Sequence, residues 1–240
     1  MRERSRTERA IRLLLLILGA AVMVLPFIYM ASTSLKEQAF VLTFPPEFVP
    51  RHPTFANYVA AWTKQDFARY SLNSVIVATT STAGSVLVSL MMAQAFARYR
   101  FVGQKILFGM VLLGLMVPAM TLIVPQFVLA KQLHLLDTRA GLVLFYVGTT
   151  MALNTFLLTS FLKGIPHELE EAMRVDGAGA WTRFWRLSVP LSRPAIATTT
   201  IFTFLACWDE FAWALTIIND PSLRTLPIAI QLYQGPVSYT

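Results

Sequence analysis

The sequence predicts an all-α integral membrane protein, and three observations lead to that fold class. First, 55% of the 240 residues are hydrophobic and only 14% are charged. Second, the mean hydropathy is +0.57, which is typical of a protein that crosses the bilayer several times. Third, runs of about 20 uncharged residues recur along the chain, each long enough for one transmembrane helix.

The first predicted span covers about residues 11–33. Leu13 to Ala31 is a run of 19 residues without a charge, preceded by a basic segment. A signal peptide has a shorter apolar core and ends at small residues, and residues 30–32 match such a cleavage site only weakly. We therefore predict an uncleaved span.

The second predicted span covers about residues 70–97. Residues 36–69 precede it and carry four prolines, which is typical of an irregular loop. The span itself is rich in serine and threonine, from Thr79 to Ser89. Small hydroxylated residues let transmembrane helices approach closely, so we interpret them as packing positions.

The third and fourth predicted spans cover about residues 106–130 and 141–162. Pro118 and Pro125 lie within the third, and a proline inside a helix removes a hydrogen bond and clashes with the preceding turn. We therefore expect a kinked or broken helix. Asn154 is the one amide of the fourth span.

The fifth predicted span covers about residues 194–218. Ser192 and Pro194 supply a cap and a first turn for it. In the tail that follows, the apolar run Leu226 to Ile230 is too short to cross a membrane.

The distribution of basic residues predicts the orientation. With alternating spans, one side of the membrane holds 13 of the 20 Lys and Arg residues, including the N-terminus and residues 163–193. Cytoplasmic loops carry the excess of positive charge, so these segments are predicted to be cytoplasmic. The net charge of +7 is thus explained by topology and not by nucleic-acid binding.

The longest polar interruption in the second half of the chain, residues 163–193, predicts two short helices. Pro166 suits a first helical position, and Glu168, Glu170 and Glu171 suit the positive end of a helix dipole. Gly177, followed by a second glycine, predicts the end of this first helix.

The second short helix is predicted from an aromatic pattern. Trp181, Phe184, Trp185 and Ser188 follow at helical spacing, and Pro190 is expected to end the helix. Two interpretations remain open on these residues alone: a compact helix–turn–helix, or an amphipathic loop lying on the lipid surface.

This loop resembles the EAA loop of the permease subunits of ATP-binding-cassette importers. The resemblance rests on Glu171, Ala172, Met173, Asp176, Gly177 and the stretch from Leu187 to Pro190, which keep the complete spacing of that motif. Met173 departs from it, because the family usually has a small alanine there. Asp176 before the glycine is similar to the sugar-importer branch related to the maltose system.

Further stretches resemble the same branch. They are Asn57-Tyr58, Asn73-Ser74, Ala97 to Phe101 with Gly103, Trp208 to Phe211, and Thr225 to Pro227. Asp209 departs from the asparagine common there. The resemblance covers nearly the whole chain and implies the type I importer permease fold with six spans. We therefore expect a sixth span beyond Thr240, with a five-span variant as the alternative.

The resemblance also implies a function and its partners. It implies a subunit of a cytoplasmic-membrane importer, most commonly of carbohydrate, that works with a second permease subunit, an ATPase dimer and an external solute-binding protein. The sequence has no GxxxxGK[ST] phosphate loop, so ATP is expected on the partner subunits and no cofactor in this chain. The coupling contacts to the ATPase are expected from Glu171, Ala172, Met173, Asp176, Gly177 and Pro190.

Asp209 and Glu210 are a second candidate site. Because charge is costly inside the bilayer, two adjacent acids should face a water-filled cavity or a neighbouring subunit. They are interpreted either as a structural contact or as lining of the translocation path, together with Trp208 and Asn154. Neighbouring carboxylates also leave a proton-coupled carrier as an alternative, which the energy source of transport would distinguish.

A metal site and a catalytic centre are not expected. The three histidines are distributed over different connections, Cys207 is the single cysteine and cannot form an intrachain disulfide, and the sequence offers no nucleophile–base pair.

Overall fold

The computed structural model describes residues 6–232 apart from 38–48, 51 and 65. The chain divides into two compact units, Met1–Phe67 and Ala68–Thr240. The described residues form helices and turns and contain no β-strand. The predicted all-α class is therefore confirmed.

The first unit contains α1 (Arg6–Ser34) and α2 (Ala56–Lys64). The apolar side chains of α1 are exposed along its length, which suits a helix surrounded by lipid. The end of α1 is tied to α2 by the Asn57 side-chain amide, which donates to the carbonyls of Ser34 and Lys36 at 3.0 and 2.6 Å. The prediction of a wholly irregular connection was wrong at α2, which begins after the Thr54 hydroxyl accepts a hydrogen bond from the Ala56 N–H.

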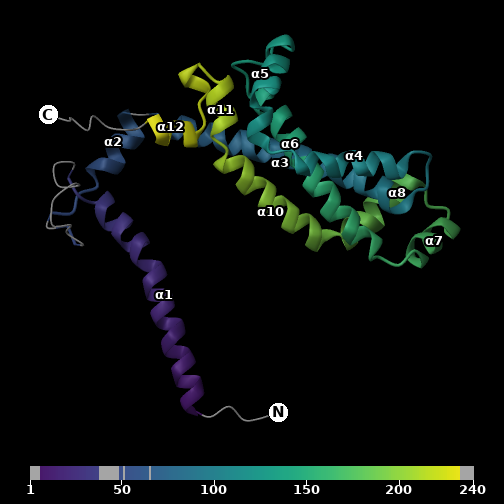
Figure 1. Ribbon diagram of the computed structural model, residues 1–240, viewed down its shortest axis with the longest axis horizontal. Coiled ribbons are helices and arrows are strands. Elements are labelled where there is room, and N and C mark those ends of the chain that lie inside the picture. The colour runs from purple at the N-terminus through teal and green to yellow at the C-terminus, as the bar shows by residue number, and fades with distance from the viewer. Residues whose placement is uncertain (1–5, 38–48, 51, 65, 233–240) are drawn as a thin grey trace. The chain divides into compact units, whose positions relative to one another are not determined.

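The second unit contains the remaining helices. They are α3 (Phe67–Arg98), α4 (Gln104–Met116), η2 (Ala119–Leu122), α5 (Ile123–Gln132), α6 (Arg139–Lys163), α7 (Glu168–Val175), α8 (Ala180–Arg183), η3 (Phe184–Ser188), α9 (Val189–Leu191), α10 (Arg193–Asp209), α11 (Ala212–Ile217), η4 (Pro221–Leu223) and α12 (Leu226–Leu232). Both α4 and α10 pack on α6. Figure 1 shows α7 and α8 at one end of this unit, and α5 and α11 towards the other.

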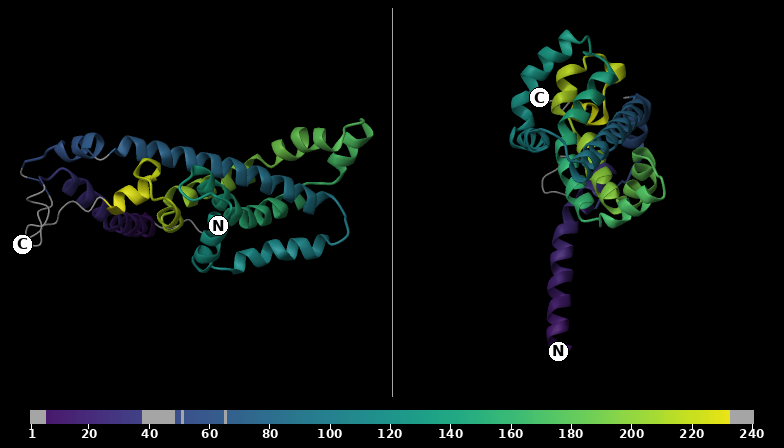
Figure 2. Two further views of the ribbon diagram at one scale, coloured as in Figure 1. Left: turned by 90° about the horizontal axis from the view of Figure 1, so that it is seen from above. Right: turned by 90° about the vertical axis from the view of Figure 1, so that its right-hand side faces the viewer.

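Among the described residues, three helices are long and apolar enough to cross a membrane: α1, α3 and α6. A fourth is added if α4 and the η2–α5 segment count as one span, although they meet at 98°. The predicted break in the third span is confirmed, and the sharp turn of the chain is visible in Figure 2. Val117 is extended because the proline that follows it disfavours a helical conformation.

The residues predicted as the fifth span form two helices, α10 and α11. The first begins at Arg193, directly after Ser192. The prediction that Ser192 caps it was wrong, because the Ser192 hydroxyl is buried without a hydrogen bond. The helical path stops at Glu210, whose backbone is extended.

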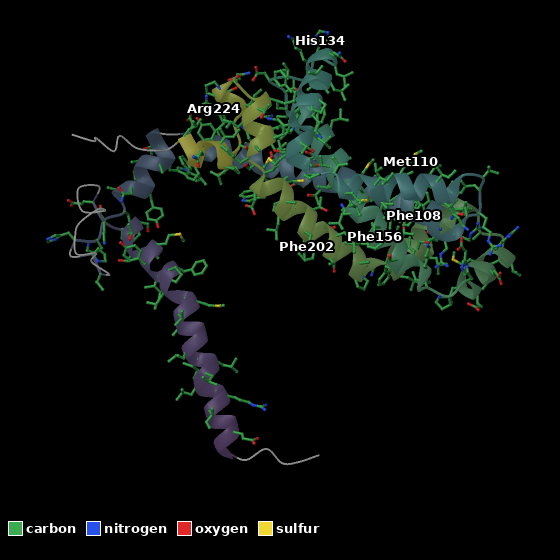
Figure 3. All side chains as sticks on the ribbon, in the orientation of Figure 1. Phe108, Met110, His134, Phe156, Phe202 and Arg224 are labelled. Atoms are coloured by element: carbon green, nitrogen blue, oxygen red, sulfur yellow. The ribbon has the colours of Figure 1, made fainter. Side chains whose placement is uncertain are left out.

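Two apolar clusters hold the second unit together. One lies towards α11 and includes Leu142, Trp213 and Ile217. The other lies towards α7 and α8 and includes Leu158 and Phe184. Outside these clusters, large side chains stay exposed on α4, α6 and α10, among them the residues labelled Met110, Phe156 and Phe202 in Figure 3, as expected for surfaces that face lipid or another subunit.

Two sequence motifs about 150 residues apart meet at the end of this unit that is remote from α7. The Asn73 side chain donates to the carbonyls of Ser222 and Arg224 at 3.0 and 2.9 Å and accepts from the Arg139 guanidinium at 2.8 Å. The adjacent Ser74 hydroxyl accepts from the Leu226 N–H at 2.8 Å. The Asn73-Ser74 and Thr225 to Pro227 stretches are therefore parts of one contact.

The Asp137 carboxylate joins the connection between α5 and α6 to the residues that follow α11. Asp137, between α5 and α6, accepts hydrogen bonds from the backbone N–H groups of Asp220 and Asn219. These hydrogen bonds favour the charged form and lower the pKa of the Asp137 carboxyl below its ordinary value.

Candidate functional site

The loop between α6 and α10 is built around a tight turn at Gly177. This residue has a φ of +80°, in the left-handed region where side chains are strained. The Gly177 N–H bonds the Arg174 carbonyl at 3.1 Å and the Ala178 N–H bonds the Met173 carbonyl at 2.9 Å. This pair of bonds is a Schellman motif, so the predicted helix end at Gly177 is confirmed. At the other end, α7 begins two residues later than Pro166.

The helix α7 presents two different faces. Glu171, Ala172 and Val175 are exposed, and Val175 reaches 87% exposure. Glu170 and Met173 are partly buried on the opposite face. The larger side chain of Met173 is therefore accommodated inside the loop. Within the part of the chain that the structure describes, the Glu171 side chain has no ion pair or hydrogen bond.

Glu170 lies between two arginines from other elements. Its carboxylate is 3.5 Å from the Nε atom of Arg98, the last residue of α3, and 3.4 Å from the Nε atom of Arg183 in α8. The loop is thus a compact helix–turn–helix with an internal charge cluster, which supports the first of the two interpretations of this segment.

The second arm of the loop carries an aromatic cluster. The Phe184 ring is buried and lies 5.5 Å from the Trp181 ring and 5.1 Å from the Trp185 ring, between ring centroids. Both tryptophans remain exposed. The helical spacing predicted for these residues is confirmed.

The prediction that Pro190 ends this arm was wrong. Residues 184–188 form a π-helical turn, Pro190 lies inside α9, and after Ser192 the helix continues as α10. The Ser192 N–H still bonds the Ser188 carbonyl at 3.0 Å. Proline ordinarily clashes with the carbonyl one turn before it, and a widened turn relieves that clash.

Asn154 holds three helices together. Its amide donates to the Ser85 hydroxyl of α3 at 3.0 Å and to the Thr203 hydroxyl of α10 at 2.8 Å. The side chain is buried, and its oxygen accepts from the Thr203 hydroxyl at 3.1 Å. This geometry favours an interhelical contact, which is an ordinary role for amides within membranes.

The adjacent acids Asp209 and Glu210 have different surroundings. The Glu210 carboxylate accepts from the backbone N–H groups of Trp213 and Ala214, at 2.8 and 3.1 Å, and from the Tyr146 hydroxyl at 2.7 Å. It therefore caps α11 and ties it to α6. Asp209 is exposed and lines a cavity of about 310 Å³ together with Trp208.

No group of three or more potential metal ligands occurs among the described residues.

The two acids therefore differ in role: Glu210 forms a structural contact, whereas the Asp209 side chain faces open space. Lining of a translocation path by Asp209 and Trp208 stays a prediction.

Comparison with known proteins assigns the family. Residues 85–238 match the family described as the binding-protein-dependent transport system inner membrane component. The chain belongs to this family. The resemblance to importer permeases, first drawn from the loop around Gly177, is confirmed.

Relatives and a solved structure agree with this assignment. The permease is 34% identical to the diacetylchitobiose uptake system permease protein NgcG of Streptomyces coelicolor, over 98% of this chain and 78% of that one. It is 36% identical to the sulfoquinovosyl glycerol transport system permease protein SmoH of Agrobacterium fabrum, over 89% and 75%. Its fold matches a chain of a bacterial ABC transporter involved in the import of the acidic polysaccharide alginate, with a TM-score of 0.84, 24% identity, and coverage of 100% and 85%.

Sequence reasoning singled out Glu171 of the permease and missed Glu170. The available signal was periodicity, because Glu170, Met173 and Gly177 are spaced three and four residues apart and so share a helix face. That face is the one directed into the loop. The partner Arg98 was noted only as part of the Ala97 to Phe101 stretch.

Proposed function

We propose that this permease is the membrane-spanning subunit of an ATP-driven importer of a carbohydrate, and that α7 docks on an ATPase subunit. The observation that carries the docking role is the outward face of Glu171, Ala172 and Val175. An exposed, partly apolar face with one unpaired carboxylate, next to a tight turn, suits a cleft with a complementary cation.

The carbohydrate class is supported by the relatives. The systems of NgcG and SmoH are both named for molecules that contain a sugar. The family name describes transport that depends on a binding protein, which supports such a partner. We infer that an external binding protein delivers the solute, that a second permease subunit completes the pathway, and that ATP binds to two partner ATPase subunits.

The mechanism we infer is alternating access. Closure of the ATPase pair would move α7, and the spans attached to the loop would change between outward and inward openings. Glu171 would form the charge contact to the ATPase, and the small Ala172 would allow close approach. Asp176, exposed at the end of α7, and Gly177 would shape the turn. The proton-coupled alternative is not favoured by the family assignment.

Copurification in mild detergent tests the docking role. We expect an ATPase subunit to purify with the wild-type permease and to be lost from Val175→Asp, because the exposed apolar part of the docking face would then carry a charge that is costly to bury in the contact. Leu133→Asp is the matched control, since Leu133 is also an exposed apolar residue but follows α5, towards the other end of the unit.

Two outcomes of this experiment would contradict the proposal. One is the absence of any ATPase subunit from wild-type preparations that still contain a solute-binding protein or a second permease. The other is an equal amount of ATPase in the Val175→Asp and wild-type preparations.

A further inference from the structure

We infer that Glu170 is a positioning residue that fixes the loop to the end of α3, so that movement of α7 is transmitted to the spans. This inference rests on the proposed function. It assigns transmission to Glu170 and docking to the outward face that contains Glu171, although the two glutamates are adjacent in sequence.

Three elements converge on the Glu170 carboxylate. One oxygen is 3.5 Å from Arg98 Nε and the other is 3.4 Å from Arg183 Nε. The carboxylate therefore joins α7 to α3 on one side and to α8 on the other.

Each arginine also holds a second piece of the loop. Arg98 donates to the carbonyl of Ile165 at 3.1 Å and to Nδ1 of His167 at 3.3 Å, both in the connection that leads into α7. Arg183 donates to the carbonyl of Ala178, one residue past the tight turn, at 2.6 Å. The start and the end of α7 are thus fixed through the same charge cluster.

The cluster is shielded from water. The side chains of Arg98, Arg183 and Glu170 are 2%, 14% and 16% exposed. Charge pairs are screened less when they are removed from solvent, and loss of one partner leaves the others uncompensated. Without the Glu170 charge, the two cations would lose their shared counter-charge, and the helix would lose its fixed angle to α3.

The outward face does not depend on this cluster. Glu171, Ala172 and Val175 lie on the opposite side of α7 and remain exposed whether or not Glu170 carries a charge. Transmission and docking are therefore separable by substitution.

The test compares Glu170→Gln with wild type in a complex reconstituted into proteoliposomes with its ATPase and binding protein. We expect the ATPase subunit to remain bound, and the amount of ATP hydrolysed per solute imported to rise roughly fivefold or more, the lower end of ordinary coupling between two sites. Arg98→Gln should give at least the same increase, because it also removes the hydrogen bonds to Ile165 and His167. The double variant should add little to Arg98→Gln, because the interaction with Glu170 is already lost there.

Arg100→Gln is the matched control, since it removes a neighbouring exposed positive charge outside the cluster, and it should keep the wild-type ratio. An unchanged ratio in Glu170→Gln would overturn the inference, as would loss of the ATPase subunit from that variant. Failure of the proposed function looks different: wild-type transport would then not require ATP.

Discussion

At the scale of single residues, the position of Gly177 is restricted by its backbone conformation and not by crowding from neighbouring atoms. A side chain placed there would meet no heavy atom within 4 Å, yet the φ of +80° is one that L residues rarely adopt. Only the backbone conformation therefore restricts this position, and the two hydrogen bonds of the turn depend on it.

Substitution of Gly177 should show this restriction. The left-handed conformation costs an L residue roughly 1–2 kcal/mol, with β-branched residues at the upper end, whereas asparagine adopts it more readily. We expect Gly177→Val to lower solute uptake and raise ATP hydrolysis per solute, and Gly177→Asn to stay near wild type in a proteoliposome assay. Wild-type uptake by Gly177→Val would refute the importance of the turn.

At the scale of elements, the start of α6 is set by one close approach. A Cβ atom on Gly141 would lie 2.3 Å from the backbone oxygen of Leu135 and 3.2 Å from the Ile217 side chain. A backbone oxygen cannot rotate away as a side chain can. The absence of a side chain at Gly141 therefore allows α6 to pack against the connection that follows α5 and against α11.

Alanine substitutions in α6 should distinguish this contact from ordinary helix propensity. We expect Gly141→Ala to destabilise the permease by about 1–3 kcal/mol, because the helix must shift. At Gly148 the same change meets nothing within 4 Å and should stabilise by about 0.5–1 kcal/mol. Thermal unfolding of the purified protein measures both, and equal midpoints for the two variants would contradict the packing argument.

Prolines show how far elements can be predicted from sequence. Pro118 and Pro190 both interrupt apolar runs, and the same rule predicts a break at each. The rule succeeds at Pro118, where the preceding Val117 is extended. It fails at Pro190, because the widened turn before it depends on tertiary packing around the buried Phe184, which no local pattern specifies.

The candidate site was predictable to a similar extent. The spacing from Glu171 to Pro190 was sufficient to indicate the loop and its tight turn, because both depend on local chemistry. The pairing of Glu170 with Arg98 could not be predicted, since 72 residues separate them and the sequence does not specify which helix ends meet. For the same reason the hydrogen bond from Tyr146 to Glu210 was not foreseen.

At the scale of the whole molecule, the second unit has two distinct ends. The loop around α7 lies at one end, and the connection labelled by His134 in Figure 3 lies towards the other, near Arg224. The excess of basic residues predicts that the α7 end is cytoplasmic.

Cysteine labelling tests this orientation. Cys207 is buried and should give little background. With a membrane-impermeant maleimide, we expect Gln132→Cys, at the end of α5, to react in intact cells once the outer permeability barrier is removed. Arg100→Cys, an exposed position just after α3, should react only after the cytoplasmic membrane is opened. The reverse pattern would show that the protein is inserted the other way round.

The continuity of the chain through Pro190 has a mechanical consequence. From Ala180 to Asp209 the chain forms one continuous helical segment, which contains a π-helical turn at Phe184–Ser188 and a single turn residue, Ser192. Its straight part, α10, has 17 residues and is about 25 Å long, so a tilt of about 10° at the near end would displace the far end by about 4 Å. That far end is at Glu210, where the helix stops and the carboxylate accepts hydrogen bonds from the start of α11 and from Tyr146. A small rotation at the end of α10 near the loop would therefore become, at Glu210, a movement the size of a water molecule or more.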